Sequence, residues 1–425
     1  MRIIEKIRGW PHSSVINVSL LAFFFLGMLV PWEDLYRFFF FAGVVPLTVW
    51  SFFKGEIPPA ATSPVILLLL LLTAYLALNS FFVGDAAFRM AFRRFRWGIT
   101  VFILAGALLI ACRQWIRRPG FYGRLFLGAV IVSGTAMMIP YLMAGDFGDR
   151  IAGVGLLWHT IQASSILLVV WTMGFVMICM AKDLRHADLV LLLAAFAVVM
   201  AVIVLSQSRG PLMAAGVTML LASVSLILWL PREKRFMAAG VMGGAGLAAG
   251  LGLWSGRALL SGYMDALLTR GLSYRPEIWK AVIEHSSSHR LFGIGPATRL
   301  PDSPAGKVLL EDTGLVFAHT HNLFLEMFYA GGVIALLMLV AALVLLFCRL
   351  FFMHAPAGVR MACVCLLMVV LMVNFTDTVS PLSAPRPAWV LFWLPLVFLV
   401  SASHPETVKR PHKDFSGQCA KSVLS

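Results

Sequence analysis

The sequence predicts an all-α polytopic membrane protein, and two properties of the chain lead to that prediction. Of the 425 residues, 60% are hydrophobic and only 13% are charged, which is more apolar than a soluble globular protein of this size needs to be. The apolar residues also form long continuous runs, whereas the strands of a membrane β-barrel alternate apolar and polar side chains. We therefore expect residues 1–425 to form a single integral membrane domain.

Apolar runs of sufficient length occur about twelve times along the chain. A helix needs roughly 20 residues to cross a hydrocarbon core about 30 Å thick. The candidate spans are residues 14–30, 36–53, 64–83, 97–112, 122–143, 158–181, 187–206, 211–230, 236–255, 323–352, 359–376 and 388–402. The first run ends in Pro31-Trp32-Glu33 rather than in a small-residue cleavage site, so we expect an uncleaved first span.

Basic residues in the short loops predict the orientation of the spans. Arg2, Lys6 and Arg8 precede the first span, and such residues favour the cytoplasm. Twelve spans then place the basic tail, residues 403–425, in the cytoplasm as well. The same count places residues 256–320 on the outer face, as one large loop with short helices between spans nine and ten.

Residues 88–96 depart from this charge rule, because the segment is strongly basic although it follows span three on the outer face. At helical spacing its phenylalanines share one face and Arg89, Arg93 and Arg96 share the other. This pattern is typical of an amphipathic helix that lies in the membrane interface. We expect these three arginines to contact lipid phosphates or a phosphorylated glycolipid. The alternative is a different span count that places the segment in the cytoplasm.

Two further arginines stand at predicted helix starts on the outer face. Arg209 lies in a six-residue connection, residues 206–211, between two apolar spans. An arginine near the hydrocarbon costs about 2.5–3.5 kcal/mol and usually has a partner, so we expect it to bind phosphate unless it simply extends to the interface. Arg275 precedes Pro276 at the start of a predicted short helix, where free N–H groups favour an anion.

A pair of histidines marks the point where the outer loop runs into span ten. His319 and His321, followed by Asn322, lie at the boundary between water and bilayer. A neutral imidazole there can move a proton at neutral pH, although His321 could also serve only as an interfacial or helix-capping residue. Glu326, on the same helical face as Asn322, and Asp377, at the outer end of span eleven, are candidate orienting partners or acceptor contacts.

A metal site is the other reading of the histidine pair. A third ligand from Glu311, Asp312, His285 or His289 would complete such a site. A His-x-His pair without a third ligand at defined spacing is a weak metal signal. We therefore expect no metal.

Four motifs, in order, resemble the O-antigen ligase family of the O-antigen ligase/polymerase superfamily. They are Ser-Arg-Gly-Pro at 208–211, Tyr-Arg-Pro-Glu-Ile-Trp at 274–279, Gly-Ile-Gly at 293–295, and His-Asn at 321–322 followed by Gly331-Gly332. The motifs cover residues 206–332. The twelve-span layout with one large loop extends the likeness to the whole chain.

The resemblance implies an enzyme at the periplasmic face of the inner membrane of a Gram-negative bacterium. Such ligases transfer a polysaccharide from undecaprenyl diphosphate to lipid A–core oligosaccharide, with inversion and without a metal or other cofactor. By motif, His321 matches the catalytic histidine, and Arg209 and Arg275 match the arginines that bind the donor diphosphate. His319 is then a structural or substrate-contacting residue, although an exchange of roles with His321 stays open. No role for nucleic acid is implied.

Two other functions remain open from the sequence. An O-antigen polymerase, or an oligosaccharyltransferase that acts on protein hydroxyls, would use the same donor and a different acceptor. The basic outer segments favour a phosphorylated acceptor. A transporter or flippase of lipid-linked sugars is the more distant alternative, but the chain lacks the paired halves that many transporters show.

Overall fold

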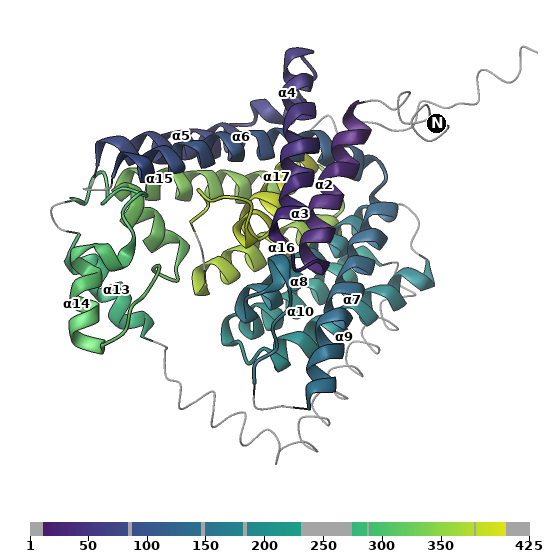
Figure 1. Cartoon of the computed structure of the whole chain (residues 1–425). Coiled ribbons are helices and arrows are strands. Elements are labelled where there is room, and N and C mark those ends of the chain that lie inside the picture. Colours follow the sequence, from purple (N-terminus) through teal and green to yellow (C-terminus); the bar gives the residue numbers. More distant parts are fainter. Residues whose placement is uncertain are drawn as a thin grey trace, which may run out of the picture.

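The computed structural model describes residues 12–83, 87–145, 149–181, 185–230, 274–286, 289–377 and 380–404. Within these ranges the chain forms helices and turns, without a strand (Figure 1). In chain order, the helices are α2 (His12–Leu29), α3 (Glu33–Phe38), η1 (Phe39–Val44), α4 (Val45–Phe53), η2 (Pro59–Thr62), α5 (Pro64–Phe82), α6 (Phe88–Arg117), α7 (Pro119–Ala144), η3 (Gly155–Leu157), α8 (Thr160–Met180), α9 (His186–Leu205), α10 (Arg209–Trp229), α13 (Arg275–Glu284), η5 (Leu300–Asp302), α14 (Pro304–Thr313), α15 (Leu323–Phe351), α16 (Ala357–Thr376), η6 (Trp389–Trp393) and α17 (Leu394–Ala402).

The described helices confirm the predicted all-helical membrane fold. Ten helical segments are long and apolar enough to cross a membrane, and the shorter apolar helix Trp389–Ala402 coincides with the predicted last span. The predicted ninth span, residues 236–255, lies outside the described residues, as do residues 256–273 of the outer loop and the tail after residue 404. The total of twelve spans and their orientation therefore stay predictions.

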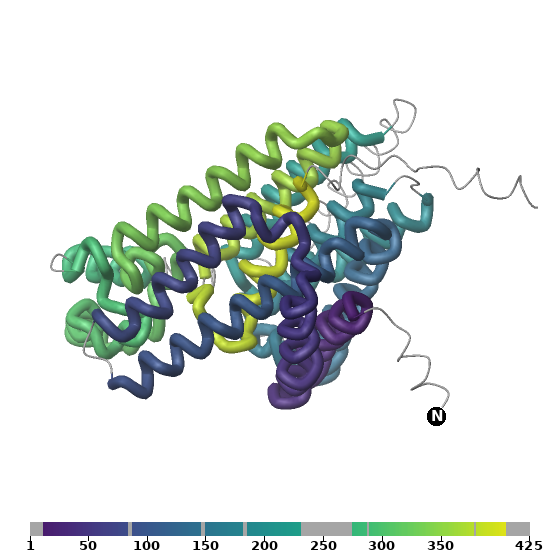
Figure 2. The backbone as a smooth tube through the Cα atoms, turned by 90° about the horizontal axis from the view of Figure 1, so that it is seen from above, coloured from purple at the N-terminus to yellow at the C-terminus, as the bar shows by residue number. Residues whose placement is uncertain are grey.

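Long helices from different parts of the chain lie side by side in two groups. Helix α5 packs against both α6 and α15, and the three run together along one side of the molecule (Figure 2). Helices α7, α8, α9 and α10 form the other group. Helix α16 packs on α8 and α10, and α17 packs on α6, so the C-terminal helices join the two groups. Helices α13 and α14 lie beside the start of α15 (Figure 1).

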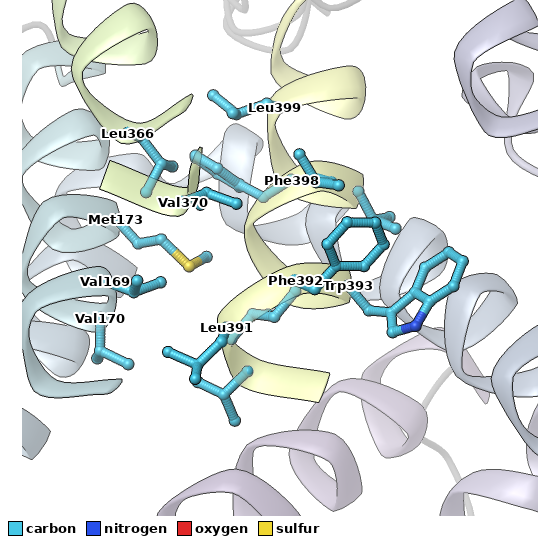
Figure 3. Close-up of a cluster of buried hydrophobic side chains, with 14 of the residues drawn as sticks. Val169, Val170, Met173, Leu366, Val370, Leu391, Phe392, Trp393, Phe398 and Leu399 are labelled. Carbon is cyan, nitrogen blue, oxygen red and sulfur yellow. The ribbon is translucent and has the colours of Figure 1, made fainter. Parts of the chain in front are cut away.

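The centre of the core is formed by α8, α16 and the C-terminal helices. Nearly every residue of α8 is buried, as expected for a helix that is apolar on all sides. Figure 3 shows Met173 of α8 and Val370 of α16 facing Phe392 and Phe398 from the C-terminal segment. These four side chains are at most 1% exposed. This core fixes the end of α16, where Asp377 follows the helix.

The basic segment at residues 88–96 differs from its prediction in one respect. It is not a separate helix in the interface, because α6 runs without interruption from Phe88 to Arg117. Arg89, Arg93 and Arg96 are exposed, as the predicted polar face requires. Arg94 points elsewhere and lines a pocket in the protein. Because α6 continues to Phe88 as one helix, Arg94 lies on the side of α6 that faces the protein.

Helix α15 contains a break that determines how its first turns are placed. Gly332 has φ +66°, which a residue without a Cβ adopts at low cost. A Cβ at this position would clash with the Leu291 carbonyl. The Val333 N–H donates to the carbonyl of Arg290 instead of to its own helix, at 2.8 Å. The Gly-Ile-Gly and Gly-Gly motifs thus pack against each other.

Polar groups around the break are satisfied by partners outside the helix. A break in a membrane helix is tolerated when neighbouring groups take up the freed carbonyls. The bonds are from the Ile294 N–H to the Tyr329 carbonyl at 2.8 Å, from the Asn79 amide to the Ala330 carbonyl at 3.2 Å, and from the Tyr75 hydroxyl to the Gly331 carbonyl at 2.9 Å. The first turns of α15 are therefore held by α5 and by the loop at residues 289–295.

Candidate active site

The loop before α15 is held in place by its own polar side chains. Asn322 caps the helix, because its Oδ1 accepts from the N–H groups of Phe324 at 2.9 Å and Leu325 at 3.1 Å. The Thr320 hydroxyl donates to Glu326 Oε2 at 2.9 Å, and the Trp279 indole donates to the Thr320 carbonyl at 3.1 Å. Asn322 and Glu326, both candidates from the sequence, thus shape the histidine loop.

His321 and Asp377 are in hydrogen-bond contact. The Nδ1 atom of His321 lies 2.7 Å from Oδ1 of Asp377, which is 2% exposed, whereas the His321 side chain is 27% exposed. Burial raises the pKa of the Asp377 carboxyl, but its interactions with His319 and His321 outweigh burial and lower the pKa below its usual range. An ionised Asp377 accepts a hydrogen bond from Nδ1–H of His321, which leaves Nε2 of His321 able to accept a proton.

His319 lies against His321 and adds a second imidazole. The ring centroids are 4.1 Å apart, and Nε2 of His319 is 3.8 Å from Asp377 Oδ1. Burial lowers the pKa of His319, but Asp377 and Glu326 outweigh it, so the pKa is raised. His319 therefore has a greater tendency to be protonated than an exposed histidine. Because His319 lies farther from Asp377 than His321 does, His321 is the better oriented of the two histidines.

Arg209 and Arg275 are neighbours that come from separate helices, and Arg275 lies within electrostatic range of Asp377. Each begins its helix, α10 and α13 respectively. Gly210 packs so closely on Thr376 that a Cβ would clash with it, which places the start of α10 next to Asp377. Burial lowers the pKa of Arg275, Asp377 raises it and the positive charge of Arg209 lowers it further. The two guanidinium groups are thus electrostatic neighbours beside the His321–Asp377 pair.

Strained backbone marks each of these three segments. Among the described residues, the non-glycine residues with positive φ are Gln207 at +50°, Tyr274 at +57° and His321 at +54°. Gln207 stands two residues before Arg209, and Tyr274 stands directly before Arg275. Such conformations cost about 1–3 kcal/mol each and concentrate at functional sites. Their coincidence with the three motif residues is independent of the sequence resemblance.

Two residues near the site were not singled out from the sequence. Arg150 donates to the Ser206 carbonyl at 2.8 Å and to the Ser208 hydroxyl at 2.9 Å, and so fixes the turn before Arg209. His159 lies within electrostatic range of Arg150, Asp377 and both site histidines, and burial lowers its pKa. Arg150 follows Asp149 in the connection before the predicted span 158–181, and His159 lies at the start of that span. A polar residue at a span end is the signal that could have found them.

The basic residues of α6 separate into two sets. Arg89, Arg93 and Arg96 are exposed at the start of the helix, and none of them lines the pocket beside His319. Arg94 does line it, together with Glu326 and Arg299. A contact of the exposed set with lipid or acceptor phosphates stays a prediction.

The residues could also hold a metal ion. One donor atom from each of His319, His321 and Asp377 lies within 4.8 Å of the others. The third ligand, Asp377, was not among the partners considered for a metal from the sequence. Mixed nitrogen and oxygen ligands suit zinc and related ions. Metal-independent chemistry is thus a prediction to be tested directly.

Comparisons with known proteins place this geometry in a family context. A family model described as O-antigen ligase matches residues 189–340, a range that contains Arg209, Arg275 and His321. An O-antigen ligase from Pseudomonas aeruginosa is 24% identical over 372 residues, which are 86% of this chain and 85% of that protein. The similarity therefore extends well beyond the matched domain.

Proposed function

Because this chain is an enzyme of the O-antigen ligase family, we propose that it transfers O-antigen polysaccharide from undecaprenyl diphosphate to lipid A–core oligosaccharide. Family membership supports a glycosyltransferase role in lipopolysaccharide assembly in a Gram-negative membrane. The donor, the acceptor, the periplasmic location of the site and the mechanism are parts of the proposal.

The reaction exchanges one bond to the anomeric carbon for another. His321 Nε2 takes the proton of an acceptor hydroxyl as its oxygen attacks the anomeric carbon of the donor's first sugar. The bond from that carbon to the diphosphate oxygen breaks, and undecaprenyl diphosphate leaves with the bonding electron pair. Attack on the face opposite the leaving group inverts the anomeric centre. General-base assistance of this kind contributes roughly 10²–10⁴-fold.

The single observation that carries the proposal is the contact between His321 and Asp377 at 2.7 Å. A carboxylate at Nδ1 fixes the ring and its tautomer, so that the free Nε2 can act as the base. Asp377 is a positioning residue in this scheme. After accepting a proton the imidazolium is stabilised by the buried carboxylate, which makes proton removal from the hydroxyl easier.

Arg209 and Arg275 supply the complementary charge. The departing diphosphate gains negative charge as the glycosidic bond breaks, and preorganised cations lower the energy of that state. Guanidinium groups suit this role because they bind phosphate oxygens in a bidentate manner and stay charged. Arg209 and Arg275, at the starts of α10 and α13, repel each other. An anion that binds between them would relieve this repulsion.

The similarity to the Pseudomonas aeruginosa O-antigen ligase, which extends over 85% of that protein, favours the ligase assignment over the polymerase and protein-transferase alternatives. The test uses purified protein, lipid-linked polysaccharide donor, and three acceptors: lipid A–core, a second lipid-linked repeat unit, and an acceptor protein. Transfer to lipid A–core alone is expected. Transfer to the repeat unit or to protein alone would replace the ligase by one of its sister activities.

A further inference from the structure

A polar pocket lies beside the histidine pair, on the side of His319. Its lining includes Arg94, Arg299, His319, Glu326 and Ser380. These residues come from α6, the loop before η5, the histidine loop, α15 and the segment after α16. Neither Arg209 nor Arg275 belongs to the lining. The pocket is therefore distinct from the two-arginine site proposed for the donor diphosphate.

Several buried polar atoms in the pocket have no hydrogen-bond partner within the described part of the chain. They are Nε of Arg94, Oγ of Ser380, and Nε2 of His319, which at 3.8 Å from Asp377 Oδ1 is beyond hydrogen-bond distance. A buried polar group without a partner costs about 1–3 kcal/mol, and these three belong to residues that line one pocket, which water or a ligand can fill. A ligand that is rich in hydrogen-bond acceptors would satisfy these atoms, since two of them are nitrogen atoms of basic side chains.

The charge around the pocket specifies the ligand further. Arg93, Arg299 and Arg386 lie within electrostatic range of Arg94, and Glu326 is the acidic group that opposes them. Glu326 is engaged by the Thr320 hydroxyl, and Arg299 pairs with Asp302 at 3.0 Å. The surroundings of Arg94 thus keep a positive excess, which attracts an anion.

The Arg94 side chain is preorganised for binding. Its guanidinium lies 4.5 Å from the centroid of the Trp97 ring, one helical turn further along α6. Stacking on an aromatic face restrains a long flexible side chain and leaves the edge of the guanidinium for a planar or tetrahedral anion. The exposed neighbours Arg89 and Arg96 lack a comparable stacking contact among the described residues.

We propose that this pocket binds an anionic substituent, phosphate or carboxylate, on the acceptor saccharide, with Arg94 as its main contact. The proposal rests on the proposed glycosyl transfer. His319 lines the pocket, and its ring centroid is 4.1 Å from that of His321. A sugar anchored at Arg94 would therefore present a neighbouring hydroxyl to His321. The pocket selects the acceptor, whereas Arg209 and Arg275 hold the donor.

The test compares Arg94→Gln with Arg113→Gln, a matched control that removes an exposed arginine further along the same helix. KM is measured for the donor and for three acceptors: the native lipid A–core, a phosphatase-treated form, and a form whose sugar carboxylates are reduced. In Arg94→Gln, the KM for the native acceptor should rise about 10–100-fold, as for a lost charge-assisted hydrogen bond. The donor KM should be unchanged, and Arg113→Gln should behave as wild type.

The modified acceptors identify the anion and can overturn the proposal. The acceptor that lacks the recognised group should bind weakly to wild type and equally weakly to Arg94→Gln. Equal losses by the variant on all three acceptors, or a change confined to the donor KM, would refute the pocket assignment. If wild type transfers to none of the acceptors, the proposed function itself fails instead.

A binding measurement on a second variant tests the proposal if Arg94→Gln folds poorly. Arg94→Lys keeps the charge but loses the planar stacking group, and the fluorescence polarisation of a dye-labelled acceptor, displaced by native acceptor, reports binding without turnover. The acceptor should bind wild type and His321→Ala at similar concentrations, and Arg94→Lys only at higher ones. Binding that is identical in Arg94→Lys and wild type would contradict the proposal.

Discussion

Replacing Asp377 with asparagine tests how His321 is prepared for proton transfer. The carboxylate lies 2.7 Å from His321 Nδ1 and is 2% exposed, so the bond is charge-assisted and shielded from water. Loss of such a bond costs about 1.5–3 kcal/mol, which is about 10–150-fold in rate if it acts in the transition state. Asparagine can also turn its amide N–H₂ toward Nδ1, which would leave the proton on Nε2 and disable the base.

The expected fall in kcat is therefore at least that for the loss of one bond. It is at most that for the loss of the whole general base, which contributes about 10²–10⁴-fold. The donor KM should change little, because Arg209 and Arg275 remain. Asp377 also raises the pKa of His319, so this pKa should fall in Asp377→Asn. The His319 titration thus checks that the charge has been removed, whereas a role of Asp377 limited to stability would leave kcat unchanged at a temperature where the protein stays folded.

The assay is glycan transfer by purified protein in nanodiscs, with His319 followed by NMR of labelled histidine. Asp188→Asn is a matched control, because Asp188 is also a buried aspartate and pairs with Arg124 at 2.6 Å, away from the site. The control should lower thermal stability and leave kcat unchanged. A kcat for Asp377→Asn equal to that of the control would refute the positioning role.

Three further predictions concern the remaining charged groups. Arg209→Ala and Arg275→Ala should each raise the donor KM about 10–150-fold through loss of a charge-assisted bond, and unchanged donor kinetics in both would rule out the diphosphate site. The raised pKa of His319 stabilises the fold fully below the ordinary histidine pKa of about 6.5, and this stability is lost as the pH rises through the raised value. Thermal unfolding should therefore show stability falling with pH over this range, and the slope should flatten in His319→Gln; an unchanged slope would contradict it. Activity should survive EDTA, whereas loss of activity that is restored by a divalent ion would assign a metal to His319, His321 and Asp377.

Much of the architecture follows from local sequence. Apolar runs gave the membrane helices to within a few residues, except that α6 begins at Phe88 rather than near residue 97. Pro276 correctly indicated a helix start, and Arg275 is its first residue. These features depend on burial in lipid and on the missing N–H of proline, which act over one or two helical turns.

Long-range pairings were beyond the sequence. Asp377 was a candidate orienting partner because of its place at a span end, but its pairing with His321 across 56 residues could not be predicted from a local pattern. Arg94 lies in the same basic segment as Arg89, Arg93 and Arg96. Its place in a pocket could not be predicted, because Arg299 and Glu326, which line the pocket with it, come from distant segments. The same holds for the break at Gly332, since its partners lie in the loop at residues 289–295.

The central claim is that His321 removes the proton from the acceptor, and a single-turnover measurement on His321→Ala tests it most directly. Purified variant and wild type are loaded with lipid-linked donor, mixed with lipid A–core, and the transfer rate and donor binding are measured. We expect donor binding to be retained and transfer to fall about 10²–10⁴-fold. Transfer at the wild-type rate by a donor-loaded His321→Ala protein would contradict the account.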